Sequence, residues 1–154
     1  MLYQKRLRDA NAFDFDDLIL KTVEVLQRFP EAKARYRSRF RHVLVDEYQD
    51  TNHAQYILVR ELVGTAADGI QPAELCVVGD ADQSIYAFRG ATIRNILQFE
   101  EDYPSARTIL LEQNYRSTQN ILSAANAVIK NNASRKAKNL WSDSGSGSLI
   151  TGYV

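Results

Sequence analysis

The sequence has little of several things that mark special classes of protein. Only one of its 154 residues is cysteine and three are proline, so a disulfide within the chain is excluded. No run of about 18 apolar residues occurs, which is the length that a transmembrane helix needs. The first residues, in which Met1 leads to Gln4-Lys5-Arg6, lack the pattern of a signal peptide. We therefore expect a cytoplasmic protein that makes no contact with a membrane.

A net charge is also absent. Lysine and arginine together number 19, aspartate and glutamate together number 19, and the formal charge is zero. This balance excludes a generally basic surface that would attract nucleic acid from a distance. Contact with nucleic acid would have to come from local geometry, so the charge neither favours nor excludes a role on DNA.

What is present is the composition of a soluble globular protein, with 45% apolar and 25% charged residues. The length predicts roughly one domain, or one and a half. The single cysteine, Cys76, stands in the apolar run Leu75 to Val78. This position predicts a buried core thiol rather than a metal ligand or a nucleophile.

Apolar spacing and cap-forming residues predict helices that alternate with strands. The expected helices run from a cap at Asp14 or Asp16 to Phe29, over 31–39, from a cap at Asp50, Thr51 or Asn52 to Leu62, over 92–101, and from a cap at Ser117 or Thr118 to about Asn131. The expected strands cover 42–45, 74–78, 107–111 and 149–154. Residues 142–148, SDSGSGS, have the composition of a flexible linker, but we favour an ordinary connecting loop.

This alternation predicts an α/β fold with a mostly parallel sheet. The first strand is apolar on both faces, as strands covered on both sides tend to be. Ligands of such sheets gather at the carboxyl ends of the strands. Three polar pairs stand at expected strand ends: Asp46-Glu47, Gly79-Asp80 and Glu112-Gln113.

The stretch VLVDEYQDTN, Val43 to Asn52, has two interpretations. In one, Asp46 holds Mg²⁺ at the end of a rigid strand and Glu47 orients or deprotonates a water molecule. Neighbouring residues of a strand point to opposite faces, so this pair can act together only if the chain turns there. In the other, Asp46 and Asp50 cap a helix and Glu47 is solvated. These residues alone do not decide between the two.

Two further segments favour the first interpretation: GDADQSIYAFRGA at 79–91 and LEQNYRS at 111–117. Together with DEYQD at 46–50, they resemble the second, third and fourth motifs of superfamily 1 DNA helicases of the UvrD, PcrA and Rep type. FDFDDLI at 13–19 resembles the segment that precedes the second motif. The resemblance covers nearly the whole chain and implies a RecA-like P-loop NTPase sheet with flanking helices. It also implies two RecA-like domains that bind Mg²⁺ and ATP and move 3′ to 5′ along single-stranded DNA.

The resemblance assigns roles around the nucleotide residue by residue. Asp46 would hold Mg²⁺, and Glu47, also assigned to the metal, would activate the attacking water. Gln83 would sense the γ-phosphate. Tyr115 would stack on the adenine, and Arg116 would act as an arginine finger from the second domain. Within the second motif, Tyr48 and Gln49 would shape the turn, and Asp50 would belong to the turn and a helix cap.

The same resemblance assigns residues to DNA. Tyr86 and Phe88 match aromatic positions that stack on bases. Arg89 would pair with the acidic motif and join the DNA surface to the ATP site. The position of Phe88 is often tryptophan in this family, so weaker stacking is expected. Without the motifs, core aromatics and a surface salt bridge at Arg116 would be the better interpretations.

A phosphate-binding loop of the form G-x-x-x-x-G-K-[ST] is missing, because no Gly-Lys dipeptide occurs in the chain. By resemblance, 1–106 is the later part of a first RecA-like domain and 107–154 the beginning of a second. The remaining helicase domains would belong to a parent protein. We expect the chain alone to bind ATP poorly and not to hydrolyse it, and to expose unpaired sheet edges.

Three functions remain open from the sequence. The first is a piece of an ATP-dependent DNA helicase of repair or replication. The second is the helicase subunit of a helicase-nuclease, whose motifs are similar. The third is a truncated protein that binds DNA or a partner without catalysis, which the missing Gly-Lys favours.

Overall fold

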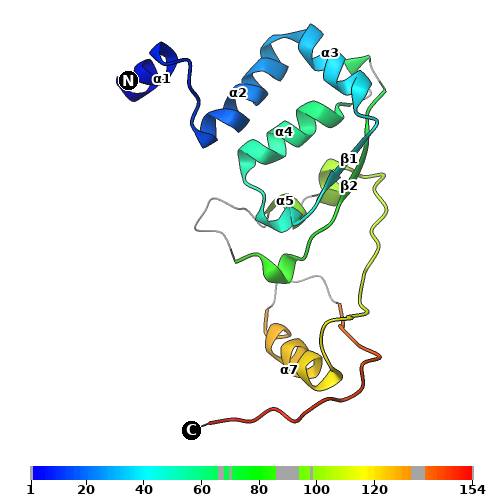
Figure 1. The fold of residues 1–154 in the computed structure, drawn as a ribbon. Coiled ribbons are helices and arrows are strands. Elements are labelled where there is room, and N and C mark those ends of the chain that lie inside the picture. Colours follow the sequence, from blue (N-terminus) through cyan, green and yellow to red (C-terminus); the bar gives the residue numbers. More distant parts are fainter. Residues whose placement is uncertain are drawn as a thin grey trace. The chain divides into compact units, whose positions relative to one another are not determined.

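The computed structural model describes residues 2–65, 68–69, 71–85, 94–97, 99–132 and 138–153. The chain divides into two compact units, Met1–Phe99 and Glu100–Val154. Unit 1 contains the only sheet of the described residues, together with the helices α1 to α5 (Figure 1). None of the helices in the described ranges has the length and apolar character that crossing a bilayer requires.

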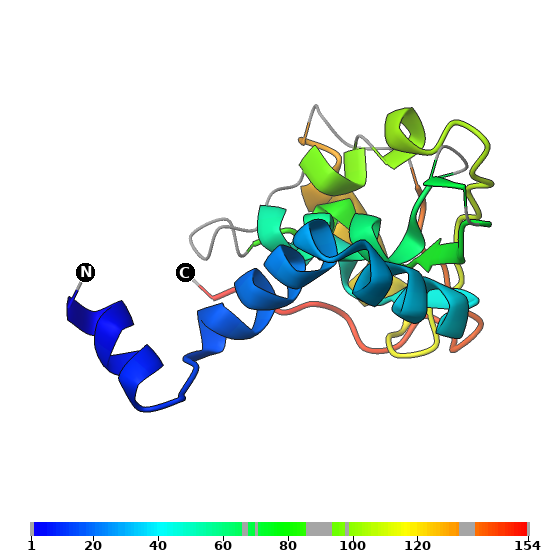
Figure 2. The same ribbon diagram turned by 90° about the horizontal axis from the view of Figure 1, so that it is seen from above.

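Helices α2, α3 and α4 begin within one residue of the positions that the sequence predicts, whereas the sequence analysis predicts no helix at α1. Helix α1 spans Leu2–Asp9, α2 Phe15–Arg28, α3 Pro30–Arg39, α4 His53–Val63 and α5 Arg94–Leu97. Asp14 caps α2 in a reciprocal capping box with Asp17, and Asn52 caps α4 in the same way with Gln55. Asn52 occupies the N-cap position of α4, for which Asp50 was another candidate in the sequence. Asp50 therefore does not cap this helix. Helices α2, α3 and α4 lie side by side (Figures 1 and 2).

The sheet of unit 1 has two parallel strands, β1 (His42–Val45) and β2 (Glu74–Val77). Both lie where the sequence predicts them, and the structure is therefore mixed α/β. Helix α4 packs against β1, and the core includes Leu26 and Val63, which are 2% and 3% exposed. Parallel pairing places the carboxyl ends of both strands at one edge.

One face of this sheet is open, contrary to the expectation of strands buried on both faces. Leu44 of β1 is 76% exposed, and its partner in register on β2 is Cys76, which is also exposed. The prediction of a buried core thiol at Cys76 is therefore wrong. Side chains alternate between the two faces of a strand, and an apolar run cannot show whether both faces are covered.

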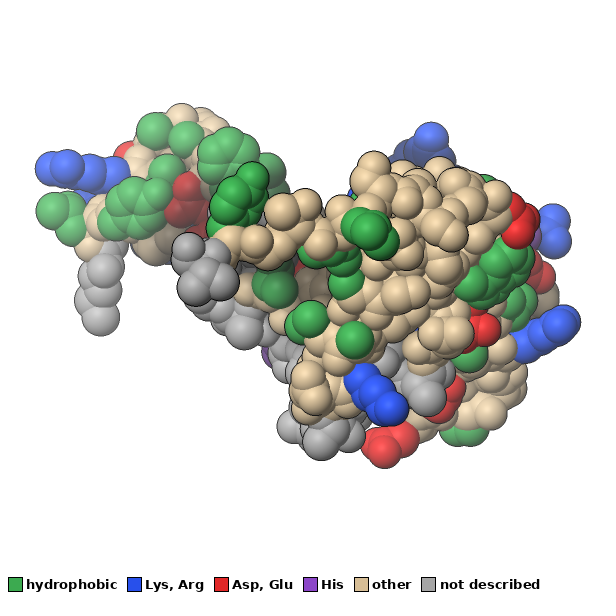
Figure 3. All heavy atoms as spheres, turned by 90° about the horizontal axis from the view of Figure 1, so that it is seen from below, with side chains coloured by type: hydrophobic (Ala, Val, Ile, Leu, Met, Phe, Trp, Pro, Cys, Tyr) green, Lys and Arg blue, Asp and Glu red, His purple; other side chains and the backbone are tan. Residues whose placement is uncertain are grey.

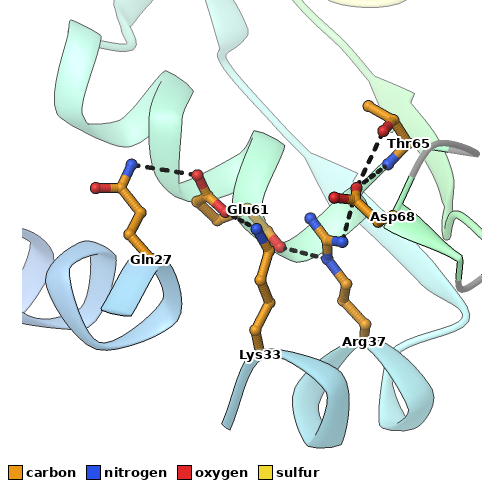
Figure 4. Close-up of polar contacts among 6 residues, drawn as sticks. All are labelled: Gln27, Lys33, Arg37, Glu61, Thr65 and Asp68. Carbon is orange, nitrogen blue, oxygen red and sulfur yellow. Dashed lines mark hydrogen bonds and ion pairs between the residues drawn. The ribbon is translucent and has the colours of Figure 1, made fainter. Parts of the chain in front are cut away.

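A buried arginine connects α3 to α4 and to the loop that follows (Figure 4). Arg37 is 7% exposed; its Nε donates to the carbonyl oxygen of Glu61 at 2.8 Å, and its Nη1 pairs with Asp68 at 2.8 Å. The Glu61 carbonyl lies in the last turn of α4, where it has no partner within the helix. Gly64 follows with φ of 78°, and a Cβ there would lie 2.7 Å from Arg37 Cζ.

Unit 2 contains α6 (Phe99–Asp102), which starts at the boundary, and α7 (Gln119–Ile129). The expected helix over 92–101 corresponds to α5 and α6, with 92–93 and 98 outside the described residues. The strands expected at 107–111 and 149–154 do not form within the described residues; an isolated parallel bridge joins Gln113 to Trp141. A strand forms only with a neighbour to bond, and Leu111 is 77% exposed.

Residues 142–148 form a connecting loop against α7, as expected. The carbonyl oxygens of Gly145 and Ser146 accept hydrogen bonds from the backbone N–H groups of Gln119 and Asn120 at 2.9 and 3.0 Å. They satisfy two of the donors that every helix start leaves free. The side chain of the N-cap residue, Thr118, makes no capping bond itself.

Acid should weaken the Arg37 contact through Asp68. The N–H of Thr65 and the Arg37 guanidinium hold the pKa of Asp68 at about 2, below the ordinary 3.8. A lowered pKa means that this stabilisation is complete above 3.8 and is lost as the pH falls through about 2. We expect Asp68→Asn to melt at a lower temperature than the unaltered chain at neutral pH. As the pH falls from 3.8 to about 2, the melting temperature of the variant should fall by less than that of the unaltered chain. Circular dichroism melts against pH test this, with Asp9→Asn as the surface control; identical acid profiles would contradict it.

Apolar side chains at the surface should make the isolated chain associate with itself. Figure 3 shows apolar side chains, in green, at several places on one face of the molecule. In the described part of unit 1, the two-stranded sheet also leaves one edge of each strand unpaired. We expect light scattering to show oligomers that grow with concentration. Leu44→Lys, which puts a charge on the open face, should reduce them. A monodisperse monomer at high concentration would contradict this expectation.

Candidate active site

The chain turns sharply directly after β1. Asp46 and Glu47 are both exposed, and Glu47 has φ of 49°, in the left-handed region that few residues other than glycine adopt. Its N–H donates to Asp46 Oδ1 at 2.9 Å. The short helix η1 (Tyr48–Asp50) follows. The turn that the two neighbouring carboxylates need in order to act together is therefore present.

The end of β2 lies next to this turn and is hydrogen-bonded to it. The N–H of Tyr48 donates to the carbonyl oxygen of Val78 at 2.9 Å. Gln49, which is 1% exposed, accepts a hydrogen bond on Oε1 from the N–H of Asp80 at 2.9 Å and donates from Nε2 to Glu47 Oε2 at 2.7 Å. One buried amide thus connects the two strand ends.

Gln83 is connected to the same network. Asp80 caps the short helix η3 (Ala81–Gln83), and its Oδ2 accepts a hydrogen bond from Gln83 Nε2 at 2.8 Å. The structure therefore brings Gln83 and Glu47 to one edge of the sheet. An open depression of about 540 Å³ lies there, and its lining consists of Glu47, Gln49, Asp50, Asp82, Gln83 and Ile85.

Buried side chains support the turn from within unit 1. Tyr48 is 1% exposed, and its ring meets that of Phe99 edge to face with centroids 5.8 Å apart. Thr51 Oγ1 donates to the Tyr48 carbonyl oxygen at 2.7 Å, and Asn95 Nδ2 donates to the Thr51 carbonyl oxygen at 3.1 Å. The sequence assigned Tyr48 and Gln49 to the turn. It gave no signal for Asn95, or for the bond from Gln49 to Asp80.

The carboxylates of Asp46 and Glu47 fit an Mg²⁺ ion that binds together with a nucleotide. Within the described ranges no three His, Cys, Asp or Glu side chains gather as a metal cage. Mg²⁺ at nucleotide sites needs only one or two carboxylates, because water and phosphate oxygens complete its shell. Asp46 and Glu47 offer exposed carboxylates on a turn that hydrogen bonds hold in place.

Tyr115 and Arg116 belong to unit 2. Tyr115 is 82% exposed, and its hydroxyl donates to Gln113 Oε1 at 2.9 Å. Asn114 Oδ1 accepts hydrogen bonds from the N–H groups of Arg116 and Ser117 at 2.9 and 2.8 Å, which shapes the loop. The Arg116 side chain is exposed. The loop follows an irregular segment instead of the expected third strand.

Three site residues of the sequence analysis lie outside the described residues. They are Tyr86, Phe88 and Arg89, in the part of GDADQSIYAFRGA that follows Ile85. The assignment of Tyr86 and Phe88 to DNA, and of Arg89 to coupling with the acidic motif, stays a prediction.

Comparisons with known proteins identify relatives of the whole chain. The UvrD/REP helicase N-terminal domain matches residues 1–104, and the UvrD-like helicase C-terminal domain matches 109–153. ATP-dependent DNA helicase UvrD1 of Mycobacterium tuberculosis is 76% identical over 153 residues, which is 99% of this chain and 20% of that protein. ATP-dependent DNA helicase PcrA of Bacillus subtilis is 56% identical over 151 residues, 98% of the chain and 20% of PcrA. The chain thus spans about a fifth of these relatives.

Gly79 should tolerate no side chain, because a Cβ there would lie 2.8 Å from Gln49 Oε1 and 3.2 Å from the Tyr48 backbone nitrogen. Gly79→Ala would push the buried amide away from Asp80. We expect a loss of about 1–3 kcal/mol in the free energy of unfolding. In the control Gly152→Ala, whose Cβ meets nothing within 4 Å, the change should stay within about 0.5 kcal/mol. Urea unfolding measures both, and equal stabilities would refute the expected crowding.

Proposed function

The chain belongs to the UvrD/Rep helicase family, and from this membership we propose that it is the part of an ATP-dependent DNA helicase that carries the metal-binding and water-activating carboxylates. The observation that carries the proposal is the hydrogen-bonded series from Glu47 through Gln49 and Asp80 to Gln83. It lies at the carboxyl ends of two parallel strands, where α/β sheets bind their ligands.

The roles follow from the chemistry of the side chains. Bound Mg-ATP would supply a γ-phosphate whose charge the metal partly neutralises. Asp46, exposed at the strand end, would hold the metal through its carboxylate or through water. Glu47 would orient the attacking water and accept its proton. The amide of Gln83 would contact the γ-phosphate and is steadied by Asp80.

The second unit supplies the remaining nucleotide contacts in this proposal. Residues 1–106 would be the later part of a first RecA-like domain, and 107–154 the beginning of a second. Tyr115 presents an exposed ring that can stack on adenine. The exposed guanidinium of Arg116 would place positive charge where the transition state gains negative charge. The loop that Asn114 shapes would carry both.

On the DNA side, the helicase would move 3′ to 5′ along single-stranded DNA in repair or replication. Tyr86 and Phe88 would stack on bases, and Arg89 would connect them to the acidic motif. The rest of the parent protein would supply the phosphate-binding loop that this sequence lacks.

A chimera tests the proposal. This chain replaces the matching segment of Mycobacterium UvrD1, with which it is 76% identical, and steady-state ATP hydrolysis is measured with and without single-stranded DNA. We expect DNA-stimulated turnover, and a fall of about 10²–10⁴ in kcat in Glu47→Gln, which removes the proton acceptor. The chain alone should show no turnover.

The matched control is Glu24→Gln, which alters a carboxylate of α2 that pairs with Lys21 and Arg28. Its turnover should equal that of the parent chimera. An inactive parent chimera, or full turnover in Glu47→Gln, would refute the proposed function.

A further inference from the structure

Gln49 is among the most deeply buried polar side chains of the described residues, and both ends of its amide are used. It is 1% exposed, donates to Glu47 Oε2 at 2.7 Å and accepts from the N–H of Asp80 at 2.9 Å. Burying an amide costs free energy unless its polar atoms are bonded. Here the two bonds lead to two different strand ends.

Glu47 needs such support. It is exposed, and its φ of 49° is uncommon for a residue with a side chain. A free glutamate side chain samples several rotamers, and restricting them costs conformational entropy. The bond from Gln49 restrains one carboxylate oxygen and leaves the other for a further contact.

The other end of the amide reaches the turn that carries Gln83. Asp80 receives its contact through the backbone N–H, and its own Oδ2 accepts a hydrogen bond from Gln83 Nε2 at 2.8 Å. Gly79 leaves room for this approach, because a Cβ there would strike Gln49 Oε1. A shift of the turn after β2 therefore moves the amide that holds Glu47.

We propose that Gln49 is a positioning residue of ATP hydrolysis, which fixes the carboxylate of Glu47 and couples it to the turn of Gln83. This inference rests on the proposed function. An amide fits here, because one end donates to a carboxylate and the other accepts from an N–H group without adding a charge. Ionised glutamate would keep the acceptor but place a second negative charge against Glu47, and leucine would lose both bonds.

The first test is kinetic and uses the UvrD1 chimera described above. Gln49→Glu should lower kcat about 10- to 100-fold, because a displaced Glu47 no longer holds water in the reacting geometry. The KM for ATP should change by less than about 2-fold, since Gln49 is not expected to bind the nucleotide. An unchanged kcat, or a loss confined to KM, would refute the positioning role.

Gln27→Glu is the matched control. Gln27 is an exposed glutamine of α2 whose Nε2 also donates to a glutamate, Glu61, at 3.2 Å. The variant also places a second glutamate against a glutamate, outside the site and next to a carboxylate that Lys33 pairs with at 2.6 Å. Its kcat should equal that of the parent chimera.

A double variant separates positioning from general damage to the fold. If Gln49 acts through Glu47, then Glu47→Gln with Gln49→Glu should be no slower than Glu47→Gln alone. A further loss, as large as that of Gln49→Glu in the parent, would mean that Gln49 only supports the fold. If the parent chimera is inactive, the proposed function fails and the inference with it; if only the Gln49 results fail, the proposed function stands.

The second test needs no turnover. Hydrogen exchange followed by NMR on the 154-residue chain should show the Asp80 amide protected. Protection should persist in Gln49→Glu, which keeps the acceptor oxygen, and should be lost in Gln49→Leu. An unprotected Asp80 amide in the unaltered chain, or equal protection in all three proteins, would overturn the inference.

Discussion

Parallel pairing of β1 with β2 is the constraint on which the candidate site depends. In register, Val45 lies opposite Val77, so both strands end at the same edge and deliver Glu47 and Asp80 to it. An antiparallel pair would send the two strand ends to opposite edges. The Gln49 amide can join them only because the Val78 and Tyr48 backbones already lie within hydrogen-bond distance.

The helices hold this strand pair in place by different means. Helix α4 begins at a reciprocal cap shortly after the turn at Asp46 and Glu47, so the turn and the helix start are one continuous local structure. The other end of α4 is held by Arg37, whose Nε donates a hydrogen bond to the Glu61 carbonyl oxygen. This oxygen has no partner within the helix. A charge buried to this degree is costly unless it is paired, and Asp68 supplies the counter-charge.

Local structure could be predicted from the sequence, and contacts over long distances could not. The caps at Asp14 and Asn52 depend on residues within one turn, and the strand that the sequence predicts at 42–45 has the bounds of β1. The strand predicted at 107–111 does not form within the described residues, because a strand needs a neighbouring strand with which its backbone can form hydrogen bonds. The contact of Gln49 with Asp80 joins residues 31 positions apart, and Asn95 reaches Thr51 across 44. Such pairs follow from strand register and helix packing, which no single segment encodes.

The exposed thiol of Cys76 gives the open face of the sheet a chemical handle. It is the only cysteine of the chain and lies opposite Leu44 on the uncovered side. A fluorophore attached there would carry no background from other thiols. Its emission would change when another molecule covers this face, so the single thiol is a site for a probe that reports such a contact.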